Sequence, residues 1–380
     1  MSSAWNRATW LSLGLGASTL IGLKSTGVLA WLISQPAWMI LLGEGLLSLV
    51  VLLLAMRVAY YADHVAGELG EPYGTLVLTG AAVVVELALI ASTMTTGEQN
   101  PTLARDSMFA VLMIALTGVK GVSILLATQE QERDLERPVE ANDLASMNLS
   151  GSSTYLDLIT TISVLALITP NFAHLTGQAN FNAPVNVVLS IAAVGLYSAF
   201  LIYQTGSYRR LFTESPEQAM RISGIHQSEI ANHQLLPAAI GLLLVGLLLL
   251  VLIAESMGQL IETSITGLGL PSSLGGVLVG LLVLAPEALN AFQAASRGEV
   301  QRSLNTLFGS ALSTLCLTVP AVLLIGEWID TPVILGLNPL EMVLLGLTLV
   351  LLRSTNNKLT TLNGLVLLVV FLFWIALQVA

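Results

Sequence analysis

Long apolar runs dominate this chain. Stretches of about 20 residues, rich in Leu, Val, Ile and Ala, alternate with short polar gaps along the whole sequence. An α-helix rises ~1.5 Å per residue, so ~20 apolar residues cross ~30 Å of hydrocarbon. Inside a bilayer each backbone group must be hydrogen bonded within its own segment, so these runs should be helices. The sequence predicts an all-α polytopic membrane protein, in contact with the lipid bilayer, with eleven spans near 9–33, 36–57, 75–96, 103–127, 155–174, 184–204, 234–255, 273–296, 301–325, 335–353 and 359–379.

Positively charged residues set the expected orientation. With the N-terminus in the cytoplasm, the inward segments carry eleven of the Lys and Arg residues, whereas the outward loops carry only Arg105. Membrane proteins concentrate Lys and Arg in their cytoplasmic loops. We therefore expect a cytoplasmic N-terminus and an external C-terminus, with residues 9–33 as a first span and not a cleaved signal.

Composition excludes several other classes of function. Hydrophobic residues make up 54% of the chain and charged residues only 10%, against about 25% charged in a soluble domain. The 14 basic and 24 acidic residues give 14 − 24 = −10, which is unlike a basic nucleic-acid groove. A single cysteine, Cys316, allows neither an intrachain disulfide nor a cysteine-rich metal site, and we expect no resident cofactor.

The chain contains an internal repeat. An offset of 201 residues aligns Glu86 with Glu287, Gly97-Glu98 with Gly298-Glu299, and Leu116-Thr117 with Leu317-Thr318. The first block would enter from the cytoplasm and the second from outside, so the repeat is inverted, as in many secondary transporters. We expect one extra N-terminal helix (1–35), a five-helix repeat (36–204), a cytoplasmic linker (205–233) and a second five-helix repeat (234–380).

Glu86 and Glu287 lie near the middle of their spans, roughly 15 Å from either surface at helical rise. A charged carboxylate at that depth is costly, so it persists when it is paired, protonated or facing a polar cavity. One interpretation is a neutral glutamate bonded to a neighbouring helix. Because the two occupy equivalent depths in the repeat, we favour a shared role in carrying cations or protons.

Oxygen-bearing side chains cluster in sequence near Glu287. Pro286 removes a backbone donor and frees a carbonyl one turn earlier. Carboxylates, carbonyls, hydroxyls and amides are the ligands that Ca²⁺ prefers. Asn290 lies on the same face as Glu287 at i+3, and the next span carries Asn305, Thr306, Ser310, Ser313 and Thr314. These polar residues are candidate ligands, but Ser and Thr in membrane helices also bond their own backbone or a neighbouring helix, so packing is the alternative interpretation.

The other charged residues within spans have structural interpretations. Lys24 and Glu44 lie at similar distances from the outer ends of adjacent spans, which predicts an ion pair between them. Lys120 is long enough to extend its ammonium towards an interface. Three acidic residues are expected to act as anchors near span ends: Asp157, Glu255 and Glu341.

Two motif blocks are similar to a known family. The first contains Gly70-Glu71-Pro72-Tyr73-Gly74, Val84-Val85-Glu86, Pro101-Thr102-Leu103 and Arg105-Asp106-Ser107. The second contains Pro286-Glu287-Ala288-Leu289, Val300-Gln301-Arg302, Asn305, Phe308-Gly309-Ser310 and Leu317-Thr318-Val319-Pro320. Together they resemble bacterial calcium/proton antiporters of the cation/calcium exchanger superfamily, over about residues 50–355.

The resemblance implies two inverted five-helix repeats in a bacterial inner membrane, whose paired glutamates bind Ca²⁺ and exchange it for H⁺. It implies ligand roles for Ser310 and Ser313, and a secondary role for Asp106. At the 201 offset the counterparts of these serines are Phe109 and Leu112, so the first repeat lacks their hydroxyls.

Several alternatives stay open. A Na⁺ or K⁺/H⁺ antiporter would use the same glutamate chemistry as a Ca²⁺/H⁺ antiporter. An intramembrane enzyme could use two carboxylates as acid and base, but the sequence has no His-Glu-x-x-His zinc motif, so we expect a transporter and not an enzyme. A channel needs no buried proton acceptor on each repeat. Oligomeric state is not indicated by the sequence.

Overall fold

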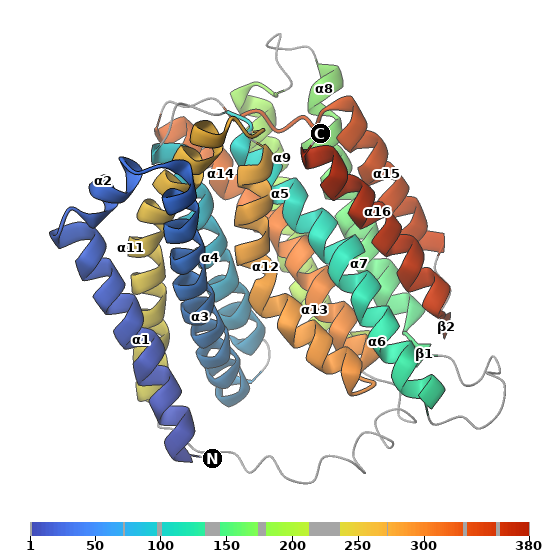
Figure 1. The fold of residues 1–380 in the computed structure, drawn as a ribbon. Coiled ribbons are helices and arrows are strands. Elements are labelled where there is room, and N and C mark those ends of the chain that lie inside the picture. Colours follow the sequence, from blue (N-terminus) through green and yellow to red (C-terminus); the bar gives the residue numbers. More distant parts are fainter. Residues whose placement is uncertain are drawn as a thin grey trace. The chain divides into compact units, whose positions relative to one another are not determined.

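The computed structural model describes residues 2–70, 73–96, 101–133, 145–173, 180–212, 236–271, 273–329, 333–354 and 358–379. This part of the chain is almost entirely helical (Figure 1). Two short strands, β1 (Ala145–Ser146) and β2 (Lys358–Leu359), pair antiparallel. The helical segments are α1 Ser2–Ser25, α2 Val28–Ile33, α3 Ala37–Leu69, α4 Tyr73–Thr96, α5 Leu103–Met113, η1 Ile114–Val119, α6 Lys120–Arg133, α7 Leu149–Ser163, η2 Val164–Ile168, α8 Pro170–Ala173, α9 Ala183–Thr205, η3 Arg209–Phe212, α11 Leu236–Leu268, α12 Ser273–Ser296, α13 Val300–Ser313, η4 Thr314–Thr318, α14 Val319–Trp328, α15 Pro339–Ser354 and α16 Thr361–Val379.

Every expected span coincides with helix. Among the described residues, eight helical segments are long and apolar enough to cross a bilayer. The other three expected spans are occupied by α1 with α2, by α4 and by α15. The all-helical, polytopic membrane fold is therefore confirmed. The expected linker falls outside the described residues from residue 213 onward, as does the Gly97-Glu98 turn.

Two helices extend well beyond their apolar runs. α3 and α11 each have 33 residues, or about 50 Å at helical rise, so they end later than the expected 57 and 255. The polar residues that follow each run continue the helix because nothing in them breaks it. Each helix instead ends at a glycine with positive φ, Gly70 (65°) and Gly269 (64°), a conformation that glycine adopts without steric cost. Glu255 consequently lies inside α11, and the expectation that it sits near a span end is wrong.

Equivalent irregularities occur in the two halves of the sequence. α4 and α12 both have 24 residues. The helix that follows each contains a π-helical segment, η1 at Ile114–Val119 and η4 at Thr314–Thr318, some 200 residues apart. π-Helical turns within α-helices are rare and often occur at functional sites. Their matched positions agree with the duplication predicted from sequence.

The chain forms two compact units, each built from both halves of the sequence. The first comprises residues 1–107, 231–286 and 321–333, and the second comprises 108–230, 287–320 and 334–380. In the first unit α11 packs along α3 and α4, and α1 packs on α3 and α11. In the second unit α16 packs on α6 and η1, and α13 packs on α7 (Figure 1). α12 passes from the first unit to the second between Pro286 and Glu287.

Candidate cation-binding residues

The two glutamates occupy matching positions on helices of equal length. Glu86 is the fourteenth residue of α4 (86 − 73 + 1) and Glu287 the fifteenth of α12 (287 − 273 + 1). Glu86 is only 3% exposed, within the first unit. In the second unit, Oε2 of Glu287 is buried and has no hydrogen-bond partner among the described residues. The Glu287 carboxylate therefore has an oxygen available to a proton or a cation, which is the simplest way to lower the cost of burying it.

Ser310 and Ser313 lie on α13, immediately before η4. The Ser313 hydroxyl is 5% exposed and donates a 2.9 Å hydrogen bond to the carbonyl of Ser310. A hydroxyl that donates its one proton to the backbone still has lone pairs that can accept or coordinate. These two residues can supply neutral oxygen ligands in the second unit, which also contains Glu287.

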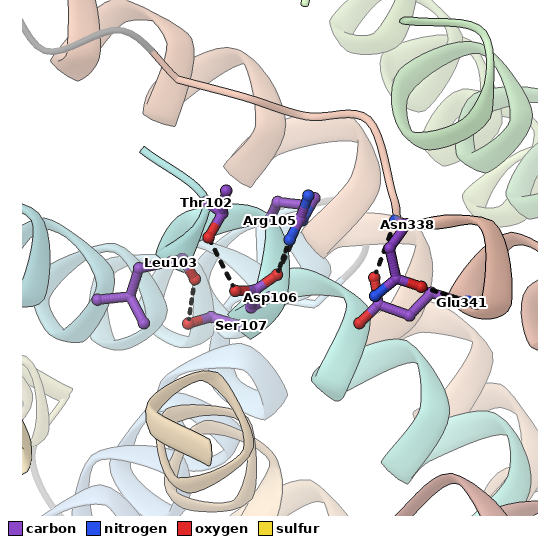
Figure 2. Close-up of polar contacts among 7 residues, drawn as sticks. All are labelled: Thr102, Leu103, Arg105, Asp106, Ser107, Asn338 and Glu341. Carbon is purple, nitrogen blue, oxygen red and sulfur yellow. Dashed lines mark hydrogen bonds and ion pairs between the residues drawn. The ribbon is translucent and has the colours of Figure 1, made fainter. Parts of the chain in front are cut away.

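Asp106 is engaged in a buried ion pair in the first unit. Its Oδ1 lies 2.6 Å from an Nη of Arg105 and accepts a 2.8 Å hydrogen bond from Nε of the same guanidinium (Figure 2). Its Oδ2 accepts a 3.1 Å hydrogen bond from the Thr102 hydroxyl. The carboxylate is 6% exposed, and both of its oxygens are occupied. Asp106 is thus neutralised by its sequence neighbour, and its charge is not free to attract a transported ion.

The two asparagines differ in environment. Asn305 Nδ2 donates to the carbonyl of Phe212 at 2.5 Å, and its Oδ1 accepts from Gln301 Nε2 at 2.8 Å. Gln301 in turn accepts a 2.7 Å hydrogen bond from the backbone of Asn148. Asn305 therefore ties α13 to η3 and to the start of α7. Asn290 is exposed on α12.

Glu341 and Asn338 cap the start of α15 in the second unit. The Glu341 carboxylate accepts a 3.2 Å hydrogen bond from the backbone of Asn338, whose Oδ1 accepts a 2.9 Å bond from the backbone of Glu341 (Figure 2). This reciprocal arrangement is a capping box, which satisfies two orphan donors at a helix start. Glu341 therefore caps α15 and is only 4% exposed, whereas its expected role as an anchor at a span end stays a prediction.

Two charged residues differ from their sequence-based interpretations. Lys24 pairs with Glu255 at 2.6 Å, whereas Glu44 is buried on α3 with an Oε2 that has no hydrogen-bond partner among the described residues, so the predicted Lys24–Glu44 pair is wrong. Lys120 is 0% exposed, so it does not extend to an interface. Neither the Lys24–Glu255 pair nor the burial of Lys120 could be predicted from sequence, because the rotation of a helix about its axis decides which way a charged side chain points.

No group of three or more His, Cys, Asp or Glu side chains able to hold a metal ion occurs among the described residues. The candidate ligands consequently form no preassembled acidic cage of the kind that binds resident calcium.

Comparison with known proteins places the chain in a family. Residues 13–206 and 238–380 match the family model described as sodium/calcium exchanger protein. The sequence is 31% identical over 328 residues to the sodium-potassium/proton antiporter ChaA of Escherichia coli, covering 86% of each chain. It is 31% identical over 346 residues to the putative ionic transporter y4hA of Sinorhizobium fredii, covering 90% of this chain and 88% of that one.

Solved structures share the fold at lower identity. The structure of native YfkE superposes with a TM-score of 0.66 at 15% identity, covering 97% of this chain and 99% of that one. The H⁺/Ca²⁺ exchanger CAX superposes with a TM-score of 0.60 at 15% identity, covering 96% of this chain and 89% of that one. The helical architecture, the family match over most of the length and the two relatives agree, so this chain belongs to the sodium/calcium exchanger family and is a multi-pass membrane antiporter of cations, not an enzyme.

Proposed function

We propose that this antiporter exchanges a cytoplasmic cation for protons, and that Glu86 and Glu287 alternately bind the cation and the protons. The observation that carries the proposal is the buried Glu287 Oε2, which has no hydrogen-bond partner among the described residues, on a helix matched in length by the one that bears Glu86. A buried carboxylate is stabilised by a proton or by a cation, and the two neutralise it in mutually exclusive ways. Exchange results when the protein with an empty, ionised site cannot readily convert between its inward-facing and outward-facing conformations.

Na⁺ or K⁺ is the first candidate for the transported ion. The relative that covers 86% of this chain at 31% identity is named a sodium-potassium/proton antiporter. Ca²⁺ takes six to eight oxygen ligands, roughly, in protein sites. In the described structure the oxygens of Asp106 and Asn305 are already hydrogen bonded, and Phe109 and Leu112 replace the serines of the other half.

Ca²⁺ is the second candidate, although the sequence alone placed it first. Two carboxylates match the charge of one divalent ion, and the motif blocks resemble calcium/proton antiporters. The structures of similar fold include an H⁺/Ca²⁺ exchanger, whose 15% identity supports the fold and leaves the ion to experiment.

The proposal includes a location and a domain plan. The loop charges support a cytoplasmic N-terminus and an external C-terminus, and the relative from Escherichia coli supports the inner membrane of a bacterium. The matching lengths of α4 and α12, and the matching positions of η1 and η4, support one extra N-terminal helix (1–35) followed by two inverted repeats (36–204 and 234–380) joined by a linker (205–233).

Proton flux in proteoliposomes tests the proposal. Purified protein reconstituted with an internal pH-sensitive dye would be challenged separately with Na⁺, K⁺ and Ca²⁺. Glu86→Gln and Glu287→Gln should each abolish cation-driven proton movement, because an amide of the same volume cannot neutralise a cation. Glu68→Gln, which changes an exposed glutamate near the end of α3, serves as the control and should transport normally. More than about a tenth of wild-type transport in a folded Glu86 or Glu287 variant, a loss under about 1.4 kcal/mol, would overturn the proposal.

A further inference from the structure

Glu44 is a buried carboxyl group in the first unit. It is the eighth residue of α3 (44 − 37 + 1), and only 5% of its surface is exposed. Its Oε2 is buried and has no hydrogen-bond partner among the described residues. An ionised carboxylate that is buried in this way loses its hydration without gaining a full set of donors, so the charged form is strongly disfavoured.

The helices packed on α3 provide no counter-charge for Glu44 among the described residues. These helices are α1, α2, α4 and α11. α2 contains no charged residue, and the charged residues of α11 are the acids Glu255 and Glu262. On α1, Lys24 is already paired with Glu255 at 2.6 Å, and Arg7 lies near the other end of the helix.

The titratable residues of α4 and of α3 itself are acidic or distant. On α4 they are Glu86, another acid, and Tyr73, which lies beside the Gly74 that packs on Ala66, near the far end of α3. On α3 the nearest is Arg57, which is 57 − 44 = 13 residues away, or about 20 Å along the helix axis. The others on α3 all follow it: Tyr60, Tyr61, Asp63, His64 and Glu68. A proton is therefore the positive charge that can neutralise Glu44.

The hydrogen bonds of Ser264 indicate where this proton lies. The Glu44 carboxyl group hydrogen bonds with the side chain of Ser264 on α11. Ser264 is 2% exposed, and its hydroxyl donates a 2.9 Å hydrogen bond to the carbonyl of Ile261. A serine hydroxyl has one proton to donate and two lone pairs that accept. Because that proton is used on Ile261, Glu44 has to be the donor to Ser264, and a carboxyl group donates only when it is protonated.

We propose that Glu44 is a further proton-binding site, at which the bound proton joins α3 to α11 and makes the contact between these two helices sensitive to pH. The protonated carboxyl group donates to Oγ of Ser264, and Oε2 remains as a neutral carbonyl oxygen. Alkaline pH removes the proton, so the donor is lost and an uncompensated charge stays buried in the contact. The inference is independent of the proposed function, because it does not require Glu44 to bind the transported cation.

Infrared spectroscopy of the purified protein tests the protonation, because a carboxylic acid and a carboxylate absorb at different frequencies. At neutral pH, the wild-type spectrum minus that of Glu44→Gln should contain one carboxylic-acid band. Ser264→Ala should shift this band, because the acid loses the oxygen to which it donates. Ser256→Ala is the matched control and should leave the band in place, since it changes a serine of the same 2% exposure on the same helix. A difference spectrum without a carboxylic-acid band would show an ionised Glu44 and would overturn the inference.

Melting temperatures measured against pH test the sensitivity of the contact. A glutamate in an unfolded chain ionises above about pH 4.3, so above this pH folding has to take up a proton at Glu44 and stability falls as pH rises. The wild type should therefore lose stability relative to Glu44→Gln between about pH 5 and about pH 9, by up to about tenfold in the folding equilibrium constant per pH unit. Glu68→Gln, which changes an exposed glutamate of the same helix, should follow the wild type. Parallel pH profiles for the wild type and Glu44→Gln would overturn the inference.

Discussion

Lys24 Nζ lies 2.6 Å from Oε2 of Glu255, which links α1 to the middle of α11. The two side chains are 48% and 53% exposed, so the pair lies at the periphery of the first unit. α1 is therefore fastened to α11 by a charge as well as by packing.

A double-mutant cycle measures this pair. Lys24→Met and Glu255→Gln should each lower the free energy of unfolding slightly, and the double variant should lose less than the sum of the two. Because both groups are about half exposed, we expect a coupling of about 0.5 kcal/mol. Thermal unfolding of detergent-solubilised protein reports each value. Lys24→Met combined with Glu44→Gln is the comparison, and its effects should add because no hydrogen bond or ion pair joins these residues. Additive effects for Lys24 and Glu255 would contradict the pairing.

The positions of the helices could be predicted because a backbone inside a bilayer has no water to hydrogen bond with and must adopt a structure that pairs its own groups. An apolar run of about 20 residues must satisfy its own backbone groups, so its position and structure follow from its sequence. Helix length did not follow, because the polar continuations of α3 and α11 are equally compatible with helix and with loop. The π-helical segments η1 and η4 have no recognised sequence signature.

The candidate site was partly predictable for a related reason. The depths of Glu86 and Glu287 can be counted from the ends of an apolar run, and the structure places both within helices of matched length. The partners of a side chain depend on helix rotation and on neighbours far away in sequence. The sequence therefore did not predict the hydrogen bond from Asn305 to the carbonyl of Phe212 or the complete burial of Lys120.

Gly276 allows α12 to approach α5 closely within the first unit. A Cβ added there would lie 2.6 Å from the backbone carbon of Asp106 and 2.8 Å from the nitrogen of Ser107, so the backbone would have to move. Gly276→Ala should lower stability by about 1–3 kcal/mol, as overpacking does. Gly241→Ala is the matched control, because a Cβ on that α11 glycine meets nothing within 4 Å. Equal melting temperatures for both variants would contradict this close packing.

The Arg105–Asp106 pair should contribute to stability and not to ion affinity. Arg105→Met leaves the Asp106 carboxylate, which is 6% exposed, without its counter-charge, and the expected loss is about 3–5 kcal/mol. Adding Asp106→Asn removes the uncompensated charge, so the double variant should recover part of this loss. Asp106→Asn alone should keep Na⁺ and Ca²⁺ affinity within about threefold of wild type. A folded Asp106→Asn protein that loses ion binding would make Asp106 a ligand.

The number of protons released should depend on the charge of the ion. Within a low-dielectric region, one Na⁺ replaces the charge of one proton, whereas one Ca²⁺ replaces that of two. Cation affinity should therefore fall as pH falls, because protons occupy the carboxylates that the ion requires. Below the pKa values of the carboxylates, a plot of log affinity against pH should rise with a slope near one for Na⁺ and near two for Ca²⁺. Isothermal titration calorimetry of purified protein, in two buffers of different ionisation enthalpy, counts the same protons independently. A slope near zero for both ions would show that cation and proton bind at separate groups, and a slope near one for both ions would show that only one carboxylate exchanges its proton.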